Sequence, residues 1–200
     1  MNRTLRVAAP VALAMSLIGC AGLIGGGGKA PDWLLTLTPQ SPAPESIART
    51  AGPGEAVTIE VPVIPREIRT TRVPVHSGQI AIAYVEDLTW ADTPDRLFQD
   101  LLSETVIRTT NRVVLDPRQS SLDPGMTISG NLSRFGYDAQ DGMVVVRYDA
   151  AMSRPGATQV VTRRFEAREP ADGTAETVAP AINAAANRVA IDVAQWVGAS

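Results

Sequence analysis

The chain has 200 residues, of which 44% are hydrophobic and 20% are charged, a balance typical of one globular domain with a tether. Its formal net charge is −3, and one lysine, Lys29, with scattered arginines forms no basic patch for phosphate groups. Composition therefore argues against a nucleic-acid-binding domain and against an intrinsically disordered chain.

Residues 1–19 have the organisation of a cleavable signal peptide. Arg3 and Arg6 precede an apolar run from Val7 to Ile18. That run spans about 12 residues, which is too short for the ~20 of a transmembrane helix but typical of a signal sequence. We therefore expect export rather than a membrane-spanning segment.

The sequence Leu17-Ile18-Gly19-Cys20 resembles the lipobox of bacterial lipoproteins. The resemblance implies cleavage before Cys20, a diacylglycerol thioether on its sulfur and an acylated new N-terminus. Several acyl chains on one residue give lasting membrane attachment. Cys20 is the only cysteine, so a structural disulfide within the chain is excluded. The alternative is an ordinary secretory signal with an unrelated cysteine near the cleavage site.

Residues 20–31 are rich in glycine and are predicted to form a flexible tether ahead of a domain at residues 32–200. They do not form a phosphate-binding P-loop, because Leu23 and Ala30 stand where that motif requires Gly and Ser or Thr. Ala21 follows the lipidated cysteine in place of aspartate, which by the sorting rule of enterobacterial lipoproteins implies the outer membrane. The expected location is its periplasmic face.

Strands are predicted first in the folded part. Trp33–Leu37 is a short strand candidate, and Ala56–Val63 alternates Val57, Ile59, Val61 and Val63 with more polar residues, which predicts one buried face. Pro62 and Pro65 indicate an edge or a strand end, followed by an irregular loop over 65–78. Residues 79–86 are apolar on both faces, which is typical of a central strand.

A helix is predicted from Asp95 to Val106. Thr93 can cap it, and Pro94 suits its first position because the N–H that proline lacks would be unpaired there. The apolar positions that recur at helical spacing are Leu97, Phe98, Leu101, Leu102 and Val106. This helix should pack one face on a sheet.

The remainder predicts a short strand at 112–115, a hairpin of 126–137 with 142–152, a strand at 159–169 and a C-terminal helix at 177–197. Pro180 is placed in the first turn of that helix, where proline is tolerated. The expected fold class is α+β: a two-layer domain with a mostly antiparallel sheet and two amphipathic helices on one face.

Reactive side chains are scarce. His76 is the only histidine and is placed in a loop, and the densest acidic cluster is Glu86-Asp87 with Asp92 and Asp95. Paired carboxylates serve acid–base chemistry only when one is buried, and acidic residues at strand ends and helix starts are usually solvated. We therefore expect no enzyme, no metal site and no cofactor.

In the order of its motifs the sequence resembles the auxiliary lipoproteins of Mce-type ABC transport systems, a family that includes the lipoprotein of the paraquat-inducible operon. The motifs are Trp33-Leu34-Leu35-Thr36-Leu37 after the lipobox, the Pro-containing segment from Val61 to Arg72, and Trp90-Ala91 before the amphipathic helix. The chain departs from the usual pattern at Arg66-Glu67-Ile68-Arg69, where the family has Tyr-Leu and Arg-Pro pairs.

The resemblance implies a component of a system that moves phospholipid or another hydrophobic solute across the periplasm, with an Mce-domain protein and an ABC permease and ATPase as partners. Homo-oligomerisation is left open. For Trp90 two roles are considered: packing under the adjacent helix, or an exposed contact with a partner or an acyl chain. The alternative functions are an envelope-assembly lipoprotein that handles no lipid, and a periplasmic hydrolase that uses His76 or Asp87.

Overall fold

The structure, a computed structural model, describes residues 33–200 apart from positions 45, 47, 79, 124 and 157. The predicted signal peptide, Cys20 and the tether lie outside the described residues. In chain order the elements are β1 (Val57–Ile59), β2 (Arg72–Ser77), β3 (Ala81–Thr89), α1 (Pro94–Thr109), β4 (Val114–Leu115), the 3₁₀ helix η1 (Pro117–Leu122), β5 (Met126–Asp138), β6 (Met143–Ser153), β7 (Val161–Pro170) and α2 (Ala175–Gly198).

The sheet is organised around β5. Strand β6 pairs with β5 along nearly its whole length and carries β7 on its other side, in antiparallel pairings. The opposite edge of β5 is shared, because β1 pairs with its beginning and β2 with its end, both in parallel. Strand β4 extends the sheet beyond β1, and β3 extends it beyond β2. The long pairings are antiparallel, as predicted, and the short parallel ones were not predicted.

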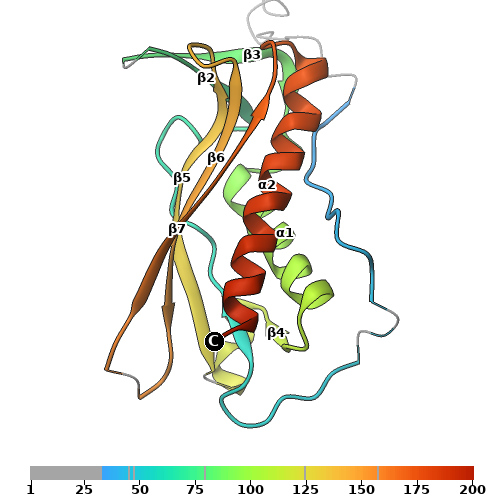
Figure 1. The fold of residues 1–200 in the computed structure, drawn as a ribbon, viewed down its shortest axis with the longest axis vertical. Coiled ribbons are helices and arrows are strands. Elements are labelled where there is room, and N and C mark those ends of the chain that lie inside the picture. The colour runs from blue at the N-terminus through green and yellow to red at the C-terminus, as the bar shows by residue number, and fades with distance from the viewer. Residues whose placement is uncertain (1–32, 45, 47, 79, 124, 157) are drawn as a thin grey trace, which may run out of the picture. The chain divides into compact units, whose positions relative to one another are not determined.

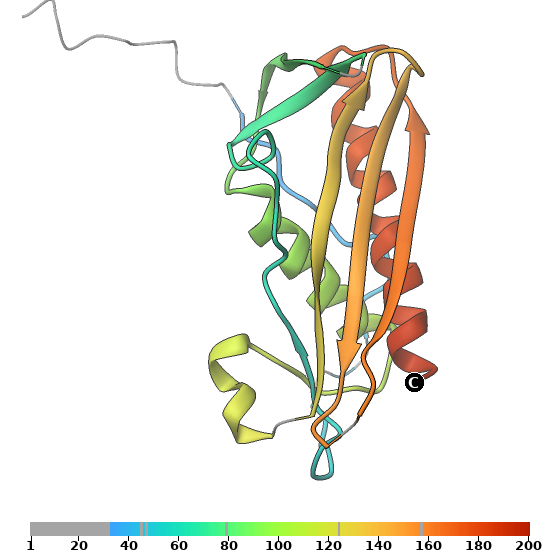
Figure 2. The ribbon, with the colours of Figure 1, turned by 90° about the vertical axis from the view of Figure 1, so that its left-hand side faces the viewer.

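Both long helices lie on the same face of the sheet, α2 along β6 and β7 with α1 beside it (Figures 1 and 2). In the described chain this makes an α+β domain with one seven-stranded sheet and two long helices, which confirms the predicted fold class. Alanines at 181, 185, 186, 190 and 194 are buried along α2. Such small side chains allow the helix to lie close to its neighbours.

The start of α1 follows the sequence signals with one exception. Pro94 is the first helical residue and Thr93 precedes it, as predicted, but the Thr93 hydroxyl makes no capping hydrogen bond. Instead the Thr93 N–H donates to Oδ1 of Asp92 at 2.7 Å. Helix α2 begins at Ala175, two residues earlier than predicted, so Pro180 lies inside the helix rather than in its first turn.

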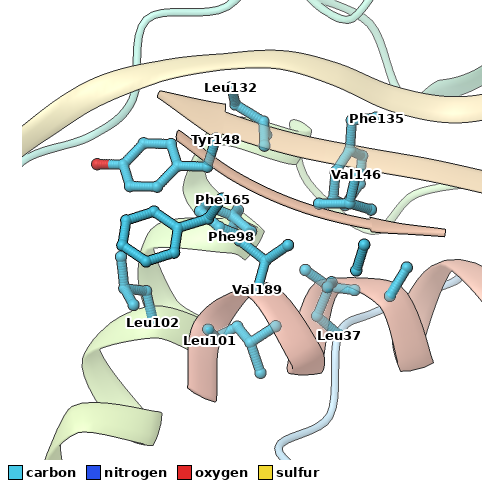
Figure 3. Close-up of a cluster of buried hydrophobic side chains, with 14 of the residues drawn as sticks. Leu37, Phe98, Leu101, Leu102, Leu132, Phe135, Val146, Tyr148, Phe165 and Val189 are labelled. Carbon is cyan, nitrogen blue, oxygen red and sulfur yellow. The ribbon is translucent and has the colours of Figure 1, made fainter. Parts of the chain in front are cut away.

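A row of aromatic rings fills the core between the helices and the sheet. Phe98 of α1 lies 5.2 Å from the Tyr148 ring and 6.3 Å from the Phe135 ring, measured between centroids, and Phe135 lies 5.4 Å from Trp90. Figure 3 shows the Phe98 and Tyr148 rings side by side. All four side chains are buried, so this row joins α1 to β5 and β6.

Two predicted strands are wrong in their extent. Residues 33–37 form no strand, and only Leu35 pairs, donating from its N–H to the Thr89 carbonyl at 2.8 Å. Strand β1 ends at Ile59, and Val61 and Val63 are exposed where burial was predicted. The alternation shifts by one residue after Ile59, so that Pro62 and Ile64 are buried instead. The chain stays beside β5 here through the Glu60 N–H, which donates to the Ile128 carbonyl, and through the bridge of Val63 with Asn131.

The largest error concerns the hairpin of β2 and β3, residues 72–89, which we call the wing. The predicted irregular loop at 65–78 contains β2, and β3 is an edge strand rather than a central one. A central strand was predicted because residues 79–86 are apolar on both faces. In the structure Ile80 is 98% exposed and Ile82 is 46% exposed.

Candidate functional site

The segment after the predicted tether is fixed to α2 by two asparagines. Asn183 accepts the Thr38 N–H at 2.9 Å, and Asn187 accepts the Gln40 N–H at 2.7 Å while donating to the Thr38 carbonyl at 2.9 Å. Asn187 is almost fully buried, so its two bonds to this segment are partly shielded from water, whereas the bond to Asn183 is exposed. A force applied through residues 20–32 would therefore act on the long C-terminal helix.

Trp90 is buried, with 1% of its surface exposed. Its ring contacts Phe135, and the backbone of Leu35 pairs beside it. The indole N–H has no hydrogen-bond partner among the described residues. This position fits the packing role considered for Trp90 and leaves no exposed indole for a partner or an acyl chain. A contact role stays a prediction that requires this region to open.

His76 lies in strand β2, not in a loop as predicted. Partial burial, followed by the charge of Arg134, holds the pKa of His76 below its usual value, so the neutral imidazole is favoured. Its Nε2 atom has no partner in the part of the chain described. Within those residues no group of three or more histidine, cysteine, aspartate or glutamate side chains is arranged to hold a metal ion.

The residues of the predicted acidic cluster form no group among the described side chains that could hold a metal ion. Asp92 lines a groove with Asp100 and Asp116, and this groove does not include Glu86 or Asp87. Burial, followed by the charge of Asp92, raises the pKa of Asp100. Asp87 instead occupies an irregular stretch of β3 at a φ of 54°, a left-handed conformation that aspartate tolerates better than most residues.

Ion pairs cover the outer face of β5–β7, the side away from the helices. Arg164 contacts Asp149 at 2.5 Å, Arg147 contacts Glu166, and Arg168 contacts Glu166 at 2.9 Å. The Arg164 hydrogen bond lowers the pKa of Asp149. Partial burial raises the pKa of Glu166, but the hydrogen bonds from Arg147 and Arg168 outweigh it and leave that pKa lowered. The charges of this face neutralise one another, so it does not favour a strongly charged partner.

Exposed apolar side chains gather near the two ends of the elongated domain. One end holds the wing and the segment that begins at residue 33, as both ribbon views show (Figures 1 and 2). The other, which we call the distal end, holds η1 and the turn between β6 and β7. These residues are Trp33, Leu34, Ile80 and Ile82 in the first region, and Leu122, Val160 and Val161 at the distal end. Val61 and Val63, which are also exposed, lie between the two ends beside the middle of β5.

The apolar tip of the wing, which carries Ile80 and Ile82, was not predicted, because both residues were assigned to a buried strand. A signal was present in Ser77-Gly78, two turn-forming residues directly before the alternating run. Gly78 adopts a φ of 75°, which glycine permits at low cost, and the chain reverses there from β2 into β3. The sequence predicts the turn. It does not show that the strands on either side of the turn are left uncovered by the other described elements.

Among the described residues, no helix is both long enough and apolar enough to cross a membrane.

The family model for the ABC-type transport auxiliary lipoprotein component matches residues 35–194. No curated protein compared with the chain matches it. Among solved structures, protein XCC0632 from Xanthomonas campestris superposes with a TM-score of 0.64 at 16% identity, covering 86% of this chain and 94% of that one. An uncharacterized protein gives 0.62 at 13% identity, covering 82% and 99%. At these identities the structures show a shared fold.

Proposed function

The chain belongs to the family of ABC-type transport auxiliary lipoprotein components, and from this premise we propose that it is the lipid-anchored, non-enzymatic accessory of an Mce-type ABC transport system. That system would move phospholipid or another hydrophobic solute across the periplasm. The observation that carries the proposal is the family match over residues 35–194, which includes every strand and α1, ends inside α2, and begins a few residues after the predicted lipobox and tether.

The anchor is proposed to be a diacylglycerol thioether on Cys20, formed after removal of residues 1–19, with residues 20–31 as the tether. The proposed location is the periplasmic face of the outer membrane. The fixed segment at Thr38 and Gln40 supports this arrangement, because a domain held on a flexible tether needs a firm attachment where the tether ends. Cys20→Ser is expected to move the protein from the membrane fraction to the soluble periplasmic fraction.

The proposed partners are an Mce-domain protein and the ABC permease and ATPase, with phospholipid as the candidate cargo. A non-catalytic role is supported by the family, whose members are transport auxiliary components. The distal end is the end proposed to face such a partner, because it lies opposite the tethered end. Leu122, Val160 and Val161 are exposed there and would form only part of the contact.

Co-purification tests the proposal. Full-length protein with a C-terminal tag is extracted from membranes in mild detergent, and bound proteins and lipids are identified by mass spectrometry, with Cys20→Ser processed in parallel. Recovery of Mce-domain or ABC subunits is the expected result. Recovery of outer-membrane assembly or envelope proteins alone would overturn it in favour of an envelope-integrity lipoprotein that handles no lipid.

A further inference from the structure

The tip of the wing extends past the residues of β2 that pair with β5. Strand β2 pairs with β5 only through Val75 and His76, opposite the last residues of β5. Beyond this point the hairpin continues through Ser77 and Ala81 with no other described strand beside it. Ile80 and Ile82 on this ribbon lie at the same end of the domain as Trp33 and Leu34, and all four large apolar side chains are exposed. A group of exposed apolar residues, unlike a single one, is typical of a membrane or partner contact.

The predicted tether places this tip near the bilayer. Cys20 and Trp33 are 13 positions apart in the sequence. A glycine-rich chain of that length has a root-mean-square span of about 20 Å and a maximum reach of about 45 Å. The wing and the segment beginning at residue 33 lie at the same end of the domain (Figure 1). The distal end is further away by roughly the length of α2, about 36 Å for its 24 residues.

The chemistry of the tip favours lipid over a protein. Two isoleucines on a narrow ribbon provide less area than the roughly 1,200–2,000 Å² that a stable protein interface buries. Shallow insertion into a bilayer needs only a few aliphatic or aromatic side chains, and tryptophan prefers the membrane interface. The net charge of −3 gives no general attraction to anionic lipid, so this contact would be apolar rather than electrostatic.

We propose that Ile80 and Ile82, together with Trp33 and Leu34, contact the bilayer that holds the lipid anchor. The domain then stands on the membrane at its tethered end and directs its distal end away from the surface. This inference rests on the proposed lipidation of Cys20. The lipid anchor attaches the protein to the bilayer, and the wing sets the orientation of the domain on the membrane surface.

The test uses lipidated full-length protein in vesicles of phosphatidylethanolamine and phosphatidylglycerol. Acylation consumes the thiol of Cys20, so Ile80→Cys introduces a single free thiol for an environment-sensitive dye. Leu122→Cys is the matched control, since Leu122 is a 76% exposed aliphatic residue at the distal end. The dye at position 80 is expected to shift to shorter wavelength and to be quenched several-fold by spin-labelled lipid, and the dye at position 122 to show neither effect.

The outcomes separate the two proposals. If both variants float with the vesicles and the dye at position 80 behaves like the dye at 122, the bilayer contact is overturned and the anchor stands. If neither variant floats, lipidation fails and the contact falls with it. If the dye at 80 stays in water until a detergent-purified Mce-domain protein is added, the tip is a partner site and the bilayer contact is overturned.

A second pair of variants tests orientation without a label. Ile80→Ser with Ile82→Ser is expected to reduce quenching of tryptophan fluorescence by brominated lipid, because Trp33 is half exposed whereas Trp90 is buried. Val160→Ser with Val161→Ser removes two exposed aliphatic side chains at the distal end and should leave the quenching unchanged. Equal quenching in both double variants and in the unmodified protein would contradict the proposal.

Discussion

The strands β5–β7 and the wing both contain alternating apolar residues, and they differ in what covers them. The inner face of β5–β7 lies under α1 and α2, and residues such as Phe135, Val146 and Tyr148 are fully buried. Among the described residues no helix lies over the tip of the wing, and Ile80 and Ile82 are exposed there. Burial of an amphipathic strand is therefore decided by its neighbours in space and not by its own pattern.

The same difference predicts unequal local stability. Strands β5 and β6 pair over most of their length, with one register shift between Leu132 and Arg134, whereas β2 is joined to β5 by two residue pairs. Segments with few buried contacts open at lower free energy than core strands. We therefore expect the amide hydrogens of the wing to exchange before those of β5 and β6.

The largest effect is expected from Phe98→Ala. Phe98 is fully buried between the Phe135 and Tyr148 rings, so truncation leaves a cavity and removes buried apolar surface. Such changes typically cost about 3–5 kcal/mol of unfolding free energy. Denaturant unfolding monitored by circular dichroism measures this loss of unfolding free energy. Ile80→Ser is the contrasting variant, and its unfolding free energy should stay within about 0.5 kcal/mol of that of the unmodified protein. A loss of similar size in both variants would contradict the expected difference in stability between the core strands and the wing.

The next effect is expected where the wing joins the sheet. A Cβ added to Gly136 would collide with the backbone carbonyl oxygen of Pro74 and lie 2.9 Å from Pro74 Cγ. Gly136→Ala should therefore push β2 away from β5 and lower stability by about 2–3 kcal/mol. Faster hydrogen exchange should be confined at first to the wing. Ser129→Ala, at an exposed position on the same strand, is the control and should leave exchange unchanged.

The predictable elements were those whose signals are local. Pro94 marks the start of α1, the period of apolar residues marks both helices, and Asp141-Gly142 marks the β5–β6 turn, where Gly142 has a φ of 65°. The parallel pairings of β1 and β2 with β5 join residues about 60 to 70 positions apart, and nothing local specifies them.

The candidate site shows the same limit. Cys20 carries its own motif and could be proposed from four residues, although the structure does not describe it. Trp90 could be singled out by type, but its burial depends on Phe135 from a distant strand. The exposed tip of the wing could not be found in advance, since a pattern that is apolar on both faces is shared by buried central strands and by uncovered hairpins.

A third prediction concerns the attachment of the segment after the tether. Asn187→Ala removes the acceptor of the Gln40 N–H and the donor to the Thr38 carbonyl, and leaves both backbone groups without these partners. The expected cost is about 2 kcal/mol. Hydrogen exchange should rise at Thr38 and Gln40 and stay slow in β5 and β6. Asn183→Ala, which removes one bond to the Thr38 N–H, should give a smaller increase in the same segment.

The smallest effect is expected on the ion-paired outer face. The pKa of Asp149 is lowered chiefly by its hydrogen bond from Arg164, so the carboxylate stabilises the fold above its ordinary pKa and loses that contribution as the pH falls through the lowered value. Both side chains are partly exposed, so Asp149→Asn should cost under about 1 kcal/mol at pH 7. Combining it with Arg164→Gln in a double-mutant cycle isolates the pair. The coupling energy should shrink toward zero as the pH falls below the ordinary pKa of aspartate and through the lowered value; a coupling that persists once Asp149 is protonated would show that the pair acts through packing rather than charge.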